Sequence, residues 1–168
     1  VMYICRMTAG NLSIRNEVIG KDNGLTYAAY YVEHETENCF VLCDDSEVVG
    51  YIICSADEKK FRKTFYREYI KKIAEIHKGE ARKVFFVPIP YLLLKCFYPA
   101  HLHINLLPEY QSKGYGTLMI NSLVDELKEK NMKSVMLLAD AENTGAIRFY
   151  ERNGFKKWTK SSILFFIF

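Results

Sequence analysis

The N-terminal half of the chain alternates between short apolar segments and polar breaks. Segments 2–7, 39–43 and 48–54 are short, apolar and rich in strand-forming side chains. Turn-forming residues at 44–46 separate the last two. The pattern predicts three strands, with the second and third joined as a hairpin.

A longer amphipathic pattern follows this hairpin. Between Asp57 and Gly79 the apolar side chains recur at steps of three and four, which is the spacing of one helix face. Asp57 is suited to cap the first turn, and Gly79 is suited to end the helix. We therefore expect one helix whose apolar stripe faces the sheet. The stripe consists of Phe61, Phe65, Tyr69, Ile73 and Ile76.

The C-terminal half predicts an alternation of strands and helices. Segment 101–107 has the alternation of a strand and ends before Pro108, 114–130 carries a helical stripe, and 133–139 is a second strand. This βαβ order requires a right-handed crossover and a parallel strand pair. Segment 83–99 is apolar and interrupted by prolines, and its pattern assigns it no element.

Two further elements complete the predicted fold. Residues 143–153 have a helical pattern that ends at Gly154, and 155–168 contain one or two closing strands. Together with the hairpin, these elements predict an α/β fold in which helices flank a central mixed, mostly antiparallel sheet. The length of 168 residues suits a single domain over residues 1–168.

Composition and charge narrow the possible partners. Lys and Arg total 23 against 20 Asp and Glu, and the net charge of +3 favours neither nucleic acid nor a membrane. The basic run at 59–72 is interrupted by acidic residues and is typical of a solvated helix face. The five cysteines lack paired CxxC spacing, so we expect buried reduced thiols and no metal site. We expect a cytoplasmic protein that is a monomer or a homodimer.

The first candidate for chemistry is a glycine-containing loop between the strand at 101–107 and the next helix. Its glycines allow the backbone to approach a ligand, and the first helical turn offers free N–H groups and the positive end of the helix dipole. A glycine pair before a helix is also common in plain turns. The candidate pyrophosphate-binding residues are Gln111, Ser112, Lys113, Gly114, Tyr115, Gly116 and Thr117.

A second motif, NTGAIRFYERNGF, begins at Asn143 and ends at Phe155. With the loop and with the apolar strand that ends at Pro108, it resembles the GNAT superfamily of N-acetyltransferases. The [QR]xxGx[GA] and NxxAxxFYxxxGF motifs of that superfamily occur here in order. The resemblance covers residues 98–158. The stretch YPAHLHINLLPEYQ is more narrowly similar to the acetyltransferase-like domain of O-GlcNAc hydrolases.

The resemblance implies a cofactor site. Acetyl-CoA is the expected cosubstrate, and no metal is expected. Ile104, Asn105 and Leu106 are expected along the pantetheine arm, with the backbone N–H of Leu106 polarising the thioester carbonyl. The resemblance assigns residues 112–117 to the pyrophosphate and Asn143 to a hydrogen bond with the pantetheine chain.

The same resemblance makes Tyr150 the acid that protonates the departing thiolate of coenzyme A. An amine acceptor must also lose a proton, because alkylammonium groups titrate near about pH 10. His103 is the tentative base, although a histidine on a strand is more often structural. Many family members have a carboxylate at the place of Asn105, and asparagine cannot accept a proton. Asp57, Asp140 and Glu142 are further candidate bases.

The predicted function is that of an acyl-CoA-dependent N-acetyltransferase. It would transfer acetyl from acetyl-CoA to a primary amine of a small molecule or protein, by direct attack on the thioester. The alternative is a catalytically silent module of the same fold that binds coenzyme A or a partner, and the departure at Asn105 supports it. The residues that choose the acceptor are expected in 11–34 and 83–99, and neither segment contains a motif.

Overall fold

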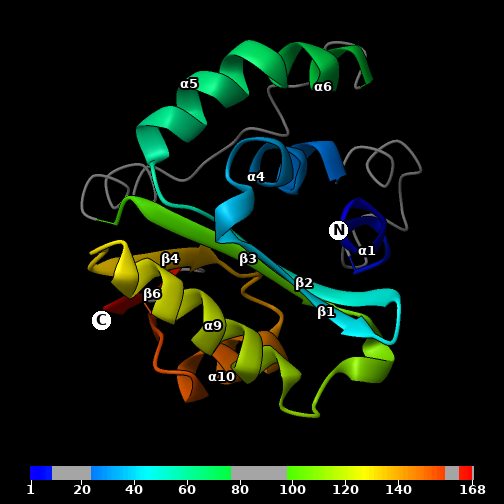
Figure 1. Cartoon of the computed structure of the whole chain (residues 1–168), viewed down its shortest axis with the longest axis vertical. Coiled ribbons are helices and arrows are strands. Elements are labelled where there is room, and N and C mark those ends of the chain that lie inside the picture. The colour runs from blue at the N-terminus through cyan, green and yellow to red at the C-terminus, as the bar shows by residue number, and fades with distance from the viewer. Residues whose placement is uncertain (9–23, 77–97, 158–162, 168) are drawn as a thin grey trace.

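The computed structural model describes residues 1–8, 24–76, 98–157 and 163–167 (Figure 1). Within these residues a six-stranded sheet has the order β1-β2-β3-β4-β6-β5. Strands β3 and β4 are parallel, and the other neighbouring pairs are antiparallel. The predicted mixed, mostly antiparallel sheet is confirmed. The strands are β1 (Cys39–Asp44), β2 (Glu47–Ser55), β3 (Ala100–Leu106), β4 (Ser134–Leu138), β5 (Lys156–Lys157) and β6 (Ile163–Ile167).

Helices cover both faces of this sheet. In the view of Figure 1, α9 and α10 lie below the sheet, whereas α1, α4, α5 and α6 lie above it. Short 3-10 turns at Thr36–Asn38 and Pro108–Tyr110 precede β1 and follow β3. The helices are α1 (Met2–Thr8), α4 (Ala29–His34), α5 (Glu58–Glu68), α6 (Ile70–Ile76), α9 (Tyr115–Glu129) and α10 (Thr144–Arg152).

Each face of the sheet has its own hydrophobic core. On one face Leu102 packs with Leu123 of α9, and both side chains are almost fully buried. On the other face Tyr51 packs with Tyr31 of α4 and Phe65 of α5. Strands β2 and β3 are therefore covered on both sides and form the centre of the molecule.

The predicted hairpin and the predicted βαβ unit are both present. Asp45 and Ser46 form the turn between β1 and β2, and Asp45 has a φ of 50°. Helix α9 connects the parallel strands β3 and β4. Helix α10 ends before Gly154, whose φ of 87° is the left-handed conformation that stops a helix.

The predicted strand at 2–7 is wrong, because these residues belong to helix α1. Ile4 and Cys5 are both buried, with 1% and 4% of their surface exposed, whereas Tyr3 and Met7 are largely exposed. Two consecutive residues can share the buried face of a helix but not one face of a strand. Packing of this short segment against β2 and β3 overrides its strand-forming composition.

The single helix predicted from Asp57 is two helices, α5 and α6, which are separated at Tyr69. The predicted cap is confirmed, because the Asp57 carboxylate accepts hydrogen bonds from the N–H groups of Lys59 and Lys60. The Tyr69 ring is buried and its hydroxyl donates to Glu33 of α4. The contact between Tyr69 and Glu33 therefore lies at the break between α5 and α6. Gly79, the expected end of the helix, lies outside the described residues, as does 83–97 of the unassigned apolar segment.

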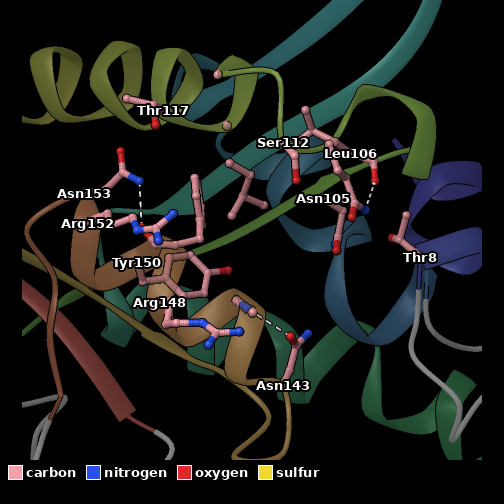
Figure 2. A pocket seen from close by; sticks show the side chains of 17 residues that line it. Thr8, Asn105, Leu106, Ser112, Thr117, Asn143, Arg148, Tyr150, Arg152 and Asn153 are labelled. Carbon is pink, nitrogen blue, oxygen red and sulfur yellow. Dashed lines mark hydrogen bonds between the residues drawn. The ribbon is translucent and has the colours of Figure 1, made fainter.

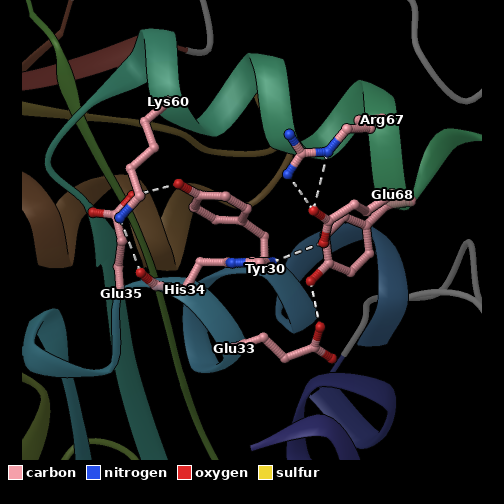
Figure 3. Close-up of polar contacts among 8 residues, drawn as sticks. Tyr30, Glu33, His34, Glu35, Lys60, Arg67 and Glu68 are labelled. Carbon is pink, nitrogen blue, oxygen red and sulfur yellow. Dashed lines mark hydrogen bonds and ion pairs between the residues drawn. The ribbon is translucent and has the colours of Figure 1, made fainter.

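A buried carboxylate joins the end of α4 to the sheet. Glu35 is 2% exposed and lies beside Tyr30 in Figure 3. The same close-up shows His34 paired with Glu68 at 3.1 Å, which links α4 to α5. Because the Glu35 carboxylate is buried away from water, hydrogen bonds from protein donors compensate for its lost hydration. The donors to Glu35 are the Tyr30 hydroxyl at 2.7 Å, the Ser55 hydroxyl at 2.7 Å, the Ala56 N–H at 2.8 Å and Asn38 Nδ2 at 3.1 Å.

We expect Glu35→Ala to lower the free energy of unfolding by about 3 kcal/mol, because several buried donors lose their acceptor together. For a protein of this size the melting temperature should fall by about 6–12 °C. Thermal denaturation followed by circular dichroism measures the change. Glu37→Ala removes an exposed carboxylate of the adjoining turn and is the control, with an expected change of at most about 0.5 kcal/mol. Equal melting temperatures for the two variants would contradict the structural role of Glu35.

Candidate functional site

Strands β3 and β4 pair only at their beginning. Their register contains the pairs Ala100 with Val135 and His101 with Met136, and it ends there. Beyond this point the two strands separate, and Asp140 and Asn143 follow on the β4 side of the opening. A gap between neighbouring strands leaves backbone N–H and C=O groups without a strand partner along each edge.

The alternation of the antiparallel β2–β3 pair determines which groups face this gap. The N–H of Leu107 donates to the carbonyl of Val49 at 2.9 Å, so Leu107 is directed toward β2. In an antiparallel pair the next residue is directed the other way. The backbone groups of Leu106 and Ile104 therefore face the gap, whereas those of Asn105 face β2. The Leu106 N–H is thus directed into the gap, and its oxyanion role stays a prediction.

The predicted loop meets α9 as a helix N-terminus without a side-chain cap. Gly114 occupies the cap position with a φ of 88°, and no side chain accepts from the first turn. The first intrahelical bond is from the N–H of Leu118 to the Gly114 carbonyl, so the preceding N–H groups point out of the helix. A Cβ added to Gly114 would meet nothing within 4 Å. The end of α9 is thus open to an anionic ligand.

The second glycine of the loop has a different role. A Cβ at Gly116 would lie 2.8 Å from Cζ of Phe149 on α10. Gly116 therefore permits close packing of α9 on α10, which brings the two helix N-termini to one pocket.

This pocket has a volume of about 790 Å³ and combines β3, the loop, α9 and α10 (Figure 2). Lys113 and Tyr115 are not among the residues that line it. Nζ of Lys113 is 5.7 Å from the centre of the Tyr110 ring, and the Tyr115 ring also lies against Tyr110. The predicted residues that the pocket brings together are Ile104, Asn105, Leu106, Gln111, Ser112, Gly114, Gly116, Thr117, Asn143 and Tyr150.

Two of these side chains shape the pocket through internal hydrogen bonds. Nε2 of Gln111 donates to the Leu106 carbonyl at 2.9 Å, which ties the loop to the end of β3. Oδ1 of Asn143 accepts from the N–H of Ala146 at 3.0 Å and caps α10. Because the cap uses Oδ1, the Nδ2 group of Asn143 is the end that can donate to a ligand.

Tyr150 extends from α10 into the middle of the pocket. Figure 2 shows its hydroxyl directed toward the wall that contains Asn105 and Leu106. Burial raises the pKa of Tyr150 to about 12. The phenol is therefore protonated across the neutral range and can act as a proton donor.

Sequence reasoning missed two cations and a helix end that line the same pocket. Arg148 and Arg152 are exposed, lie one turn apart on α10 and face the pocket across from Ser112 (Figure 2). They add positive charge near the open end of α9. The sequence feature that could have identified these two cations is the i, i+4 spacing of the arginines on the helix after Asn143. Thr8 of α1 closes another side of the pocket, and no sequence motif marks it.

His103 lies beside a second, smaller hollow between β3 and β4, which Asn105 and Tyr150 also line. Its ring is partly buried, with its centre 5.8 Å from that of Tyr27 and 5.5 Å from that of Tyr31. Asp140 borders the same hollow, and its carboxylate accepts from the N–H of Glu142. Asp57, by contrast, caps α5. None of these observations tests the predicted base.

Two other features are absent from the described residues, a metal-ligand cluster and a membrane-spanning helix. No group of three or more His, Cys, Asp or Glu side chains in the described part of the chain could hold a metal ion. Among the described helices, none combines the length and hydropathy needed to cross a membrane.

The profile of the acetyltransferase (GNAT) family matches residues 20–155. The chain belongs to this family. The N-alpha-acetyltransferase 30 of Schizosaccharomyces pombe is 24% identical over 148 residues, which cover 86% of this chain and 77% of that enzyme. The mycothiol acetyltransferase of Renibacterium salmoninarum is 36% identical over 55 residues, which are 33% of this chain and only 16% of that enzyme.

Solved structures agree with this assignment. The crystal structure of SsHAT superposes with a TM-score of 0.78 and 29% identity, and the match covers 98% of this chain and 89% of that one. The PaiA N-acetyltransferase of Thermoplasma acidophilum, solved in complex with coenzyme A, has the same fold, with a TM-score of 0.61 and 14% identity over 99% of this chain and 90% of that one. Membership of this family supports acyl-CoA-dependent N-acetyl transfer, with acetyl-CoA as the cosubstrate. The uncapped N-terminus of α9, the two arginines of α10 and the open edge of β3 fit such a ligand.

We expect Gly114→Asp to weaken acetyl-CoA binding by about tenfold more than Gly114→Asn, because only the former places a negative charge at the open end of α9. Asp and Asn have nearly the same size, and both tolerate the left-handed conformation better than most residues. Isothermal titration calorimetry gives the two dissociation constants. The difference should shrink in high salt. Equal dissociation constants would argue against phosphate binding at this helix end.

Proposed function

We propose that this GNAT protein transfers acetyl from acetyl-CoA to a primary amine of a small molecule or protein, by direct attack of the amine on the thioester. The observation that carries the proposal is that one pocket combines an open edge of β3 with the Tyr150 hydroxyl. The edge of β3 offers the Leu106 N–H as a hydrogen-bond donor, and the Tyr150 hydroxyl offers a proton for the leaving group. Acyl transfer needs both kinds of group.

The residues around the pocket divide the work of holding the cosubstrate. The free N–H groups at the start of α9 would hold the pyrophosphate together with the pocket-lining loop residues Ser112, Gly114, Gly116 and Thr117. Arg148 is a nearby cation. The gap-facing backbone of Ile104 and the Nδ2 group of Asn143 suit the amide-bearing pantetheine arm. Asn105 contributes through its side chain, because its backbone is engaged with β2.

Acetyl-CoA supplies an acetyl thioester, the activated acyl group. The Leu106 N–H would donate to the carbonyl oxygen of this group and stabilise the negative charge that develops during attack. As the N–C bond forms and the C–S bond breaks, Tyr150 would donate its proton to the sulfur. The raised pKa of Tyr150, about 12, ensures that this proton is present at neutral pH.

The acceptor amine must lose one proton in the reaction. His103 is the proposed base, because its side chain shares a face of β3 with Asn105 and borders the smaller hollow. Asp140 borders that hollow too and is the second candidate. A neutral imidazole can accept a proton directly or through water.

The first acceptor to test is suggested by a relative. The S. pombe relative, named as an N-alpha-acetyltransferase, matches most of this chain and favours a protein α-amine as the first acceptor to test. The rival proposal is a silent module that binds coenzyme A or a partner. Two features would support that rival: the resemblance of residues 98–111 to the acetyltransferase-like domain of O-GlcNAc hydrolases, and the asparagine at position 105.

An acceptor panel separates the two proposals. Release of the coenzyme A thiol is measured with acetyl-CoA and a peptide with a free α-amine, a blocked peptide with one lysine, or spermidine. An enzyme releases thiol with at least one amine, in step with acetylated product detected by mass spectrometry. A silent binder is stabilised thermally by acetyl-CoA but releases no thiol with any of them. Absence of both effects would overturn the assignment of the pocket.

For the best acceptor of this panel, we expect Tyr150→Phe to lower kcat by about 100-fold, because the thiolate loses its proton donor. The dissociation constant for acetyl-CoA should change by less than about twofold, since only one hydroxyl is removed. Steady-state kinetics and calorimetry supply the two numbers. The control is Tyr110→Phe, which removes a tyrosine hydroxyl at the far end of the loop. Phe149→Tyr is unsuitable as a control because Phe149 packs on Gly116. Unchanged kcat in Tyr150→Phe would remove Tyr150 from the mechanism.

A further inference from the structure

Asn105 has a fixed partner on the neighbouring strand. It lies directly opposite Tyr51 in the β2–β3 register, so the two side chains project from the same face of the sheet. Nδ2 of Asn105 donates to the Tyr51 hydroxyl at 2.6 Å. Tyr51 has no exposed surface, whereas Asn105 is partly exposed and lines both hollows of the site.

Tyr51 is itself held in place. Its hydroxyl also hydrogen-bonds the Cys5 thiol of α1. Burial and then Cys5 raise the pKa of Tyr51, while the bond from Asn105 acts in the opposite direction. Because a hydrogen bond that raises the pKa stabilises the protonated phenol, the Tyr51 O–H is directed to Cys5, and the phenol oxygen accepts from the Asn105 NH2 group. This bond fixes which end of the Asn105 amide is turned toward the protein interior.

We propose that Oδ1 of Asn105 accepts a hydrogen bond from the acceptor amine, and that Tyr51 is the positioning residue that turns this oxygen toward the pocket. The inference rests on the proposed acetyl transfer and extends it to the acceptor side. With its NH2 end bound to Tyr51, the amide can offer a ligand only its oxygen and any NH2 proton that Tyr51 leaves unused.

The arrangement of the sheet supports this side of approach. A nucleophile attacks a carbonyl carbon from above or below the carbonyl plane. For a thioester that lies in the gap in the plane of the sheet, those two directions would be the two faces of the sheet. Tyr150 and Phe149 of α10 occupy the α9–α10 face. Asn105 projects on the opposite face, toward α1, and Figure 2 shows Asn105 and Tyr150 reaching into the pocket from different walls. The amine would therefore enter on the Asn105 side.

This role also gives a chemical meaning to the asparagine. An amide oxygen can orient one N–H of a neutral amine, so that the nitrogen lone pair is directed at the thioester, but it cannot remove a proton. Asn105 would therefore affect acceptor binding and orientation. Deprotonation would be left to a separate group or to solvent.

The test uses two variants of Asn105, with the best acceptor of the three-amine panel. Asn105→Leu keeps a similar size but lacks the oxygen, and Asn105→Asp keeps an oxygen acceptor. We expect the KM for the amine to rise about tenfold in Asn105→Leu, the value of one hydrogen bond, and about threefold or less in Asn105→Asp. The dissociation constant for acetyl-CoA is measured in parallel, and in Asn105→Leu it should change less than the KM for the amine does.

A double-mutant cycle then examines Tyr51. Tyr51→Phe alone should raise the same KM about threefold, whereas in the Asn105→Leu background it should have no further effect on KM, because Tyr51 acts only through Asn105. Tyr69→Phe, which removes another buried, hydrogen-bonded tyrosine hydroxyl, controls for lost stability and should leave KM unchanged. Melting temperatures are measured for every variant.

Each outcome decides between distinct conclusions. An unchanged amine KM in Asn105→Leu, with the unmodified protein active, overturns this inference and leaves the proposed function intact. Multiplying effects in the cycle would assign Tyr51 a role independent of Asn105 and overturn its positioning role. No turnover of any amine by the unmodified protein would instead overturn the proposed function.

Discussion

The separation of β3 from β4 after two register pairs is the constraint on which the site depends. Strands that continued to pair would satisfy each other's backbone groups and leave no room between them. Because they separate, β3 keeps a row of outward-facing groups at Ile104 and Leu106, held rigid from behind by β2. The cosubstrate can then occupy the position of a neighbouring strand. The same gap is open to both faces of the sheet, so an acetyl donor and an amine acceptor can approach each other from opposite faces.

Helix ends supply the second requirement, a place for negative charge. Gly114 leaves the N-terminus of α9 without a cap, and the close contact of Gly116 with Phe149 fixes α10 beside it. The two glycines of one short loop thus have separate functions, one in the backbone conformation and one in packing. Arg148 adds charge from α10. The uncapped end of α9 and the Tyr150 hydroxyl of α10 are therefore placed at one pocket by two helices that pack closely because Gly116 has no side chain.

Local pattern predicted most elements of the C-terminal half because each element there carries its own period and its own boundaries. The stripe of α9, the glycine after α10 and the alternation of β3 needed no information from elsewhere in the chain. In the N-terminal half the same reasoning failed for 2–7, whose strand-forming residues are held as α1 by packing of Ile4 and Cys5. It failed again at Tyr69, where a contact with Glu33 accompanies the break between α5 and α6.

The sequence by itself determined the family motifs, the loop before α9, and the candidates Leu106, Asn143 and Tyr150, because those depend on residue types at fixed spacing along one segment. The tertiary structure decided which way those groups face. The direction of the Leu106 N–H follows from the pairing of Leu107 with Val49, and the partner of Asn105 is Tyr51, which lies 54 positions away. Strand register brings such residues together, and register is set by the packing of the whole sheet rather than by any local pattern.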